Sequence, residues 1–201
     1  MPGCGAAAAA LVLSIAVNVA MNTIFLGIGS NLNRDNALRF AVAQLRKILL
    51  DMQVSSVWES HAVRQAEPDY YNMVIKAVTR LSLEDLFAAV HRIEELAGRE
   101  LMYHQGTNFG IRRRLDIDIL LFGDTITTVP CKVPRHDIVD YPFVICPLLE
   151  LEPELIRPGD GVRIADCWEQ LRTAQQGRPF TDVRRVAFDF SQEPPAWHGD
   201  E

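Results

Sequence analysis

Apolar residues recur along this chain with two different spacings, and these spacings predict its helices and strands. Apolar positions three or four residues apart predict a helix from about Asp35 to Leu50 and another from Leu83 to Ala97. Ser82 precedes the second helix with capping-box spacing, and Gly98 follows its last residue. Alternating or continuous apolar runs predict strands at Asn22 to Ile28, Met52 to Ala62, Tyr71 to Leu81 and Leu115 to Phe122.

The order of these elements is β-α-β-β-α-β, which predicts an α+β fold of the ferredoxin-like type. In that arrangement two helices cover one face of an antiparallel sheet. The polar, glycine-containing segment Glu100 to Gly110 is expected to be a loop, long enough to act as a mobile lid. Additions follow the sixth element: a short hairpin before Pro134, an apolar turn or helix over Phe143 to Leu151, and a last helix over Gly161 to Thr173.

The length of 201 residues and the hydrophobic content of 48% fit one globular domain, which we place at residues 21–175. Residues 1–20 contain no charge and lack the basic region of a secretory signal. Three explanations are open for them: a start codon upstream of the functional start at Met21, an uncleaved apolar tail, or a membrane anchor. We favour the first. Residues 176–201 are expected to be a C-terminal tail, disordered from Glu193 onward.

The net charge of −6 argues against binding to nucleic acid, which requires cationic neutralisation of phosphates. The four cysteines are widely spaced and form neither a C-x-x-C pair nor a zinc pattern. They are typical of reduced thiols in a cytoplasmic protein. We expect a monomer without a membrane partner.

Asp116 and Asp118 are the most informative pair of residues. Because side chains alternate along a strand, both carboxylates lie on one face, and their Cα atoms are roughly 6.6 Å apart. Mg²⁺ is bound in proteins by one or two carboxylates together with phosphates and water. The neighbouring run Arg112 to Arg114 suits phosphate oxygens. The pair therefore indicates a metal-nucleotide site, although a half-buried strand can also carry aspartates on its solvent-exposed face.

Several short segments, in this order and spacing, resemble the 6-hydroxymethyl-7,8-dihydropterin pyrophosphokinase family of folate-synthesis enzymes. The resemblance covers about Met21 to Leu155. The segments are Leu26-Gly27-Ile28-Gly29-Ser30-Asn31-Leu32, Pro68-Asp69-Tyr70-Tyr71-Asn72, Arg92-Ile93-Glu94 with Gly98-Arg99, Arg113-Arg114-Leu115-Asp116-Ile117-Asp118-Ile119-Leu120, and Phe143 with Pro147-Leu148. The family has the ferredoxin-like fold that the element order predicts.

The resemblance implies transfer of diphosphate from ATP to the hydroxymethyl group of the pterin, with release of AMP. Asp116 and Asp118 would hold two Mg²⁺ ions, while Arg99 and Arg113 would stabilise charge on the transferred group. The positions expected to contact ATP are Glu94, His91, Arg112, Ile119 and Arg135. For Glu94 the alternative is a solvated carboxylate on the helix surface.

The resemblance also implies a pterin pocket. Tyr70 and Phe143 match its two stacking positions, Asn72 matches the amide that recognises the pterin edge, and Ser60 and Val63 match flanking positions. The chemistry is suitable, since a pterin has flat apolar faces and a hydrogen-bonding rim. Considered without the family, Phe143 would be a core residue and Asn72 a turn residue.

The chain departs from the family pattern at several nucleotide contacts. The usual Gly-Pro-Arg-x-x-Asp-x-Asp lacks its proline here and has one extra residue, so either Arg112 or Arg113 can be the catalytic arginine. Tyr141 occupies a usual arginine position, and Pro134-Arg135-His136 replaces a common Pro-His. Leu101 and Gln105 stand where basic residues usually occur.

Two other functions are therefore considered. One is a non-catalytic or weakly active pterin-binding paralogue, although a binding module has no need for two clustered carboxylates. The other is a nucleic-acid reader on the same fold, which would need aromatic residues and a basic sheet face. We expect the diphosphokinase.

Overall fold

Six strands form one antiparallel sheet in the computed structural model, which describes residues 20–61, 68–104, 107–174 and 183–192, without side chains for 99–113. The main path along the sheet is β7-β1-β4-β3-β8, and β2 also pairs with β4. These strands are β1 (Asn22–Ser30), β2 (Leu50–Val54), β3 (Val57–Ser60), β4 (Tyr70–Thr79), β7 (Asp116–Phe122) and β8 (Val183–Val186). The pairing of β1 with both β4 and β7 is antiparallel, as the predicted fold requires.

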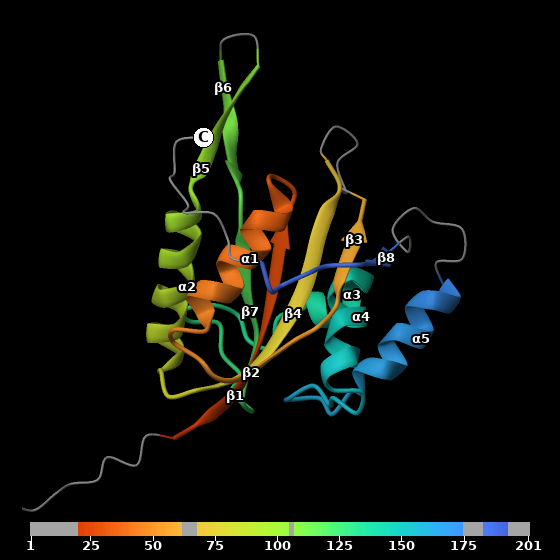
Figure 1. Cartoon of the computed structure of the whole chain (residues 1–201). Helices are drawn as coiled ribbons and strands as arrows, with labels where there is room; N and C mark the ends of the chain where they lie inside the picture. The colour runs from red at the N-terminus through yellow and green to blue at the C-terminus, as the bar shows by residue number, and fades with distance from the viewer. Residues whose placement is uncertain (1–19, 62–67, 105–106, 175–182, 193–201) are drawn as a thin grey trace, which may run out of the picture.

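Helices α1 (Arg34–Leu45) and α2 (Leu83–Ala97) cover one face of the sheet (Figure 1). The predicted limits of α2 are confirmed: Ser82 Oγ accepts the Asp85 N–H at 3.0 Å, and Gly98 follows with φ 85°. Helix α1 ends five residues before the predicted Leu50, which instead begins β2. The α+β fold of the ferredoxin-like type is therefore confirmed.

The predicted strand over 52–62 consists of two strands, β2 and β3, which are interrupted at Ser55 and Ser56. The Ser55 side chain takes part in the pairing with β4, because its Oγ accepts the Val74 N–H at 2.9 Å. The Ser55 N–H in turn donates to the Val74 carbonyl at 3.0 Å. A hydroxyl in the place of a backbone acceptor thus bends the strand without leaving an unpaired amide.

The second face of the sheet is covered by the additions that follow β7. These helices are α3 (Asp137–Asp140), α4 (Pro142–Leu151) and α5 (Ile164–Ala174), and Figure 1 shows them on the side opposite α1 and α2. Side chains from α4, including Ile145 and Leu148, pack with Phe25 and Val74 of the sheet in a second apolar core. The expected helices near 143–151 and 161–173 are confirmed.

The prediction of a loop over Glu100 to Gly110 is wrong. The chain forms a two-stranded hairpin there, β5 (Arg99–His104) with β6 (Thr107–Arg113), and the hairpin projects beyond the end of the sheet (Figure 1). The sequence contains a signal for it: an apolar run, Leu101 to Tyr103, precedes Gln105-Gly106, and Phe109 and Ile111 alternate with other residues after it. Whether the hairpin acts as a lid stays a prediction.

Strand β8 lies in the segment that the sequence analysis assigned to a C-terminal tail. It pairs with β3 over four residues, so this part of the segment belongs to the sheet. The apolar residues 1–19 and the end of the chain from 193 lie outside the described residues. Within the described residues, no helix is both long and apolar enough to cross a membrane.

Candidate active site

A cavity of about 500 Å³ opens on the second face of the sheet, where α4 leaves the ends of β1, β4 and β7 uncovered. Gly27 and Gly29 of β1 form part of its lining. A Cβ atom at Gly27 would lie 3.2 Å from Leu120 Cδ2, and one at Gly29 would lie 3.4 Å from Asn72 Oδ1. The two glycines therefore leave space where larger side chains would narrow the cavity.

Asp116 and Asp118 both line this cavity, as strand alternation predicts. Their partners on β1 are the two glycines: Asp116 pairs with Gly29, and Asp118 pairs with Gly27. Each carboxylate consequently has no side chain opposite it on the neighbouring strand. The sequence predicted the shared face, but it gave no indication of this glycine register.

Among the described side chains, Arg135 is the cation in an ion pair with Asp118. Its Nη2 lies 3.1 Å from Asp118 Oδ2, its Nε donates to Asp137, and its backbone N–H donates to the Leu120 carbonyl at 2.9 Å. Burial, followed by the charge of Asp116, raises the pKa of Asp118 to about 7, and Arg135 opposes this shift. Arg135 therefore offsets the effects of burial and neighbouring charge on Asp118 only in part.

Two aromatic rings form a wall of the cavity at the junction of α3 and α4. Tyr141 and Phe143 are stacked with centroids 5.1 Å apart and an interplanar angle of 22°. Tyr70, at the start of β4, also lines the cavity. The structure thus brings together both predicted stacking residues and adds Tyr141, which the sequence analysis noted only as the replacement of an arginine.

Asn72 and Ser60 lie on adjacent strands of the same cavity. Asn72 Nδ2 donates to Ser60 Oγ at 2.9 Å, and both residues are buried. This hydrogen bond uses one N–H of the Asn72 amide and sets the orientation of the amide group. The expected neighbour Val63 lies outside the described residues.

Glu94 is buried behind β7, with 4% of its surface exposed, so the alternative of a solvated helix carboxylate is wrong. Its Oε1 accepts the Ile117 N–H at 2.8 Å, and its Oε2 lies 2.7 Å from His91 Nδ1. Glu94 therefore joins α2 to the strand that carries the two aspartates.

A second cavity, of about 330 Å³, lies next to the first. His91, Ile119 and Arg135, three of the positions expected to contact ATP, line it. Asp116 and Asp118 line it as well, so the carboxylate pair and Arg135 are common to both cavities.

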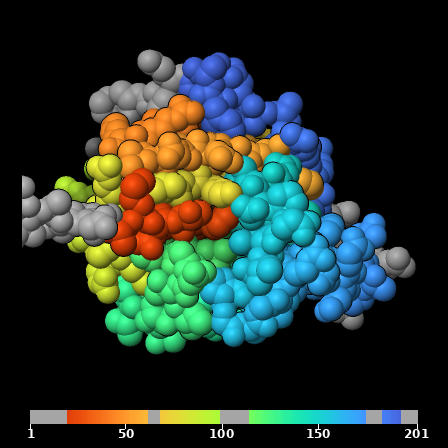
Figure 2. Space-filling view, turned by 90° about the horizontal axis from the view of Figure 1, so that it is seen from below, coloured from red at the N-terminus to blue at the C-terminus, as the bar shows by residue number. Residues whose placement is uncertain are grey.

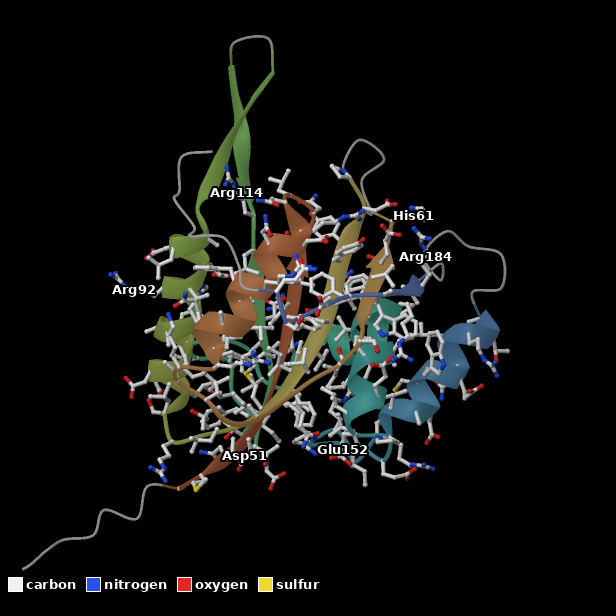
Figure 3. The ribbon with its side chains drawn as sticks, in the orientation of Figure 1. Asp51, His61, Arg92, Arg114, Glu152 and Arg184 are labelled. Carbon is white, nitrogen blue, oxygen red and sulfur yellow. The ribbon has the colours of Figure 1, made fainter. Side chains whose placement is uncertain are left out.

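The remaining predicted cations lie on the hairpin. Backbone pairing places Arg99 opposite Arg113, and Glu100 opposite Arg112. Arg114 stands at the base of the hairpin (Figure 3), where its carbonyl accepts a hydrogen bond of 2.6 Å from Ser30 Oγ. Sequence reasoning missed Asp137 and His61, which also line the larger cavity, because neither residue belongs to a recognisable spacing.

Two carboxylates between an aromatic-walled cavity and a second cavity define this α+β domain as one suited to holding a cation between two ligands. Comparison with known proteins then gives the family. The family model described as 7,8-dihydro-6-hydroxymethylpterin-pyrophosphokinase (HPPK) matches residues 25–153, and the chain belongs to this family.

Two relatives carry the name 2-amino-4-hydroxy-6-hydroxymethyldihydropteridine pyrophosphokinase. The one from Aquifex aeolicus is 35% identical over 141 residues, covering 69% of this chain and 85% of the relative. The one from Haemophilus influenzae is 34% identical over 148 residues, covering 71% and 89%.

Among solved structures, wild-type Plasmodium falciparum HPPK-DHPS with pteroate matches with a TM-score of 0.66 and 13% identity. The match covers 83% of this chain and 46% of that one, so this chain spans less than half of its length. At this identity the likeness shows the fold alone.

The residues present fit a divalent cation bound together with a phosphate ligand. Within the described part of the chain, no group of three or more histidine, cysteine, aspartate or glutamate side chains could enclose a metal. Asp116 and Asp118 can supply two oxygen ligands, which is the usual protein share for Mg²⁺ when phosphates and water supply the rest. The raised pKa of Asp118 also indicates negative charge that a cation would compensate.

The raised pKa of Asp118 predicts a pH-dependent stability of the metal-free protein. Its pKa is about 7 in the fold against 3.8 in the unfolded chain, so between these values the folded state binds more protons, and stability falls as pH rises. Asp118→Asn cannot ionise and should remove this decline. Thermal unfolding should be measured in chelator at about pH 4.5 and about pH 7.5. The melting temperature of the variant, relative to that of the unaltered protein, should be higher at the higher pH. Parallel pH profiles would contradict the assignment.

Proposed function

We propose that this chain transfers diphosphate from ATP to 6-hydroxymethyl-7,8-dihydropterin, giving AMP and the pterin diphosphate, as a step of folate synthesis. Membership of the HPPK family supports the reaction. The observation that carries the proposal is that two cavities share one carboxylate pair. A transfer between two bound substrates requires such a junction, whereas a binding module for one ligand does not.

The larger cavity is the proposed pterin site. Tyr70 and Phe143 would contact the flat faces of the ring, and the Asn72 amide would read its edge. Ser60 accepts one of the two N–H donors of the Asn72 amide, so the amide oxygen and the second N–H are suited to hydrogen-bond the pterin edge. Val63 is proposed as a flanking contact.

The second cavity is the proposed nucleotide site, with His91, Ile119 and Arg135 as contacts. Glu94 would act indirectly, by holding β7 in place through the Ile117 N–H. Arg112 on the hairpin is proposed as a further contact with ATP.

Catalysis would depend on position and charge, because phosphoryl transfer requires little covalent participation by the protein. Asp116 and Asp118 would hold Mg²⁺, two ions by the family resemblance, and the metal would neutralise charge on the phosphates and orient them. Arg99 and Arg113 would stabilise the charge that develops on the transferred group. The carboxylates and the aromatic residues of the larger cavity would bring the hydroxymethyl oxygen towards the β-phosphorus of ATP.

That the protein is a monomer and is located in the cytoplasm stays a prediction.

The reaction and the metal site can be tested together. The unaltered protein should form AMP from ATP and Mg²⁺ only when 6-hydroxymethyl-7,8-dihydropterin is present. Asp116→Ala and Asp118→Ala should each lower turnover by at least about a hundredfold, as expected when an electrostatic contact with the transition state is lost. Pterin binding without AMP formation by the unaltered chain would identify a non-catalytic paralogue. Near-normal turnover in either variant would disprove the metal assignment.

The two proposed stacking residues, Tyr70 and Phe143, should contribute to binding of the pterin and not to binding of ATP. Phe143→Ala and Tyr70→Ala should each weaken pterin affinity, because stacking contacts only a flat ring, while the affinity for an ATP analogue stays nearly unchanged. Calorimetric titration of each folded variant with the two ligands measures both effects. An equal loss for both ligands would show that these are core residues.

The hairpin register makes a prediction about the ambiguous arginines. Arg113 is the cross-strand partner of Arg99, and Arg112 is not. Arg113→Ala should therefore lower turnover more than Arg112→Ala or Arg114→Ala, and Arg99→Ala should also slow the reaction. Steady-state AMP release from the four variants makes the comparison. If Arg112→Ala is the most harmful of the three, the register of the catalytic arginine is wrong by one residue.

A further inference from the structure

Glu59 is a buried carboxylate outside both cavities, and two arginines from distant parts of the chain bind it. Its exposed fraction is 6%. Arg34, the first residue of α1, lies 2.8 Å from Oε1, and Arg184 of β8 donates through Nε to Oε2 at 2.6 Å. A buried carboxylate needs such partners, since an unpaired charge in the interior is strongly unfavourable.

Arg34 connects this ion pair to the larger cavity. The same Nη1 that contacts Glu59 also donates to the Asp69 carbonyl at 3.0 Å, and the next residue, Tyr70, lines the cavity. The Arg34 guanidinium also lies over the Tyr71 ring, 3.9 Å from its centroid. The start of β4 is therefore held by a side chain whose orientation depends on Glu59.

Strand β8 also contacts the lining of the larger cavity, through its backbone. It is the edge strand next to β3, and its pairing with β3 places Val183 opposite Ser60. Ser60 is the residue that accepts the hydrogen bond of Asn72 in the cavity. Figure 3 shows Arg184 at the end of β3 where His61 follows Ser60.

The residues after β8 continue across the other face of the sheet and attach to α1. Phe188 meets Tyr71 edge to face at 6.3 Å, and its ring lies 4.8 Å from the Arg39 guanidinium. Arg39 Nε also donates to the Asp189 carbonyl at 2.9 Å. Figure 2 shows this dark blue segment seated on the orange part of the chain that contains α1. Residues 183–190 are called the C-terminal strap below.

We propose that the C-terminal strap positions the residues of β3 and β4 that line the larger cavity, with Arg184 acting through Glu59 and Arg34. The strap lies outside residues 25–153, which match the family model, whereas Glu59 and Arg34, through which it acts, lie within them. The identity of the ligand rests on the proposed function. The positioning itself rests on the contacts of Glu59, Asp69 and Ser60.

The order of the strands makes the expected effect unequal for the two substrates. The strap contacts β3 and β4, which carry Ser60, Tyr70 and Asn72, whereas the carboxylate pair lies on β7 at the opposite end of the order β7-β1-β4-β3-β8. Loss of the strap contacts should therefore reach the pterin side and leave the nucleotide side nearly unchanged.

The test uses Arg184→Ala in the full chain, with Arg185→Ala as the matched control. Arg185 is the next residue and is similarly exposed, but its guanidinium points to Glu150, 3.9 Å away. Arg184→Ala should weaken the calorimetric affinity for 6-hydroxymethyl-7,8-dihydropterin by about two- to fivefold, the range of a partly exposed ion pair. The control variant should bind like the unaltered protein, and the affinity for an ATP analogue should not change in either variant.

A double-mutant cycle separates the proposed path from a general loss of stability. Glu59→Gln keeps the shape of the side chain but removes its charge, so adding Arg184→Ala to it should cause no further loss of pterin affinity. Equal losses for pterin and nucleotide, equal effects of Arg184→Ala and Arg185→Ala, or simple additivity with Glu59→Gln would each overturn the proposal. Absence of AMP formation by an unaltered chain that binds pterin would contradict the proposed function alone.

Discussion

The site depends on the two-sided character of β7, an edge strand of the sheet. Ile117 and Ile119 are buried under α1 and α2, and because side chains alternate, this burial directs Asp116 and Asp118 to the opposite face. The exposed edge of such a strand needs a partner for its backbone. Glu94 supplies one by accepting the Ile117 N–H, so a buried carboxylate on α2 secures the strand that presents the acidic pair.

The acidic pair is electrostatically unfavourable in itself, and the rest of the fold holds it in place. The two carboxylates lie on the same face of β7, with Asp116 exposed and Asp118 half-buried, and Arg135 is divided between Asp118 and Asp137. Burial, followed by the charge of Asp116, raises the pKa of Asp118, and Arg135 opposes this shift. Proteins tolerate unfavourable charge of this type mainly at functional sites, where a ligand supplies the missing partner. The glycines opposite the aspartates are consistent with this reading, since they keep the space free that a ligand would occupy.

The sequence predicted those parts of the fold that depend on local pattern. Helix α2, with Ser82 and Gly98 at its ends, follows from capping, and the shared face of the aspartates follows from strand alternation. The sequence did not predict the features that depend on contacts between distant segments. Strand β8 is short and becomes recognisable only through its pairing with β3, and the burial of Glu94 depends on the unpaired amide of a strand distant in sequence. The hairpin is hard to recognise because its apolar residues, Leu101 to Tyr103 with Phe109 and Ile111, are few and stand among polar residues and glycines.

The wall formed by Tyr141 and Phe143 explains how this site can differ from the family pattern while keeping its geometry. Tyr141 extends the apolar surface of Phe143 by stacking on it, at a position where the sequence resemblance to the family implies an arginine. The cavity therefore gains aromatic surface and loses a cation on that side. Arg135 is the cation that the described side chains place beside both cavities, and it is already bound to two carboxylates. Under the proposed function, the remaining phosphate charge would have to be met from the hairpin, where Arg99 and Arg113 are cross-strand neighbours. The tyrosine at position 141 and the extra arginine next to β7 would then be linked, because positive charge absent from one side of the site would be supplied from the hairpin.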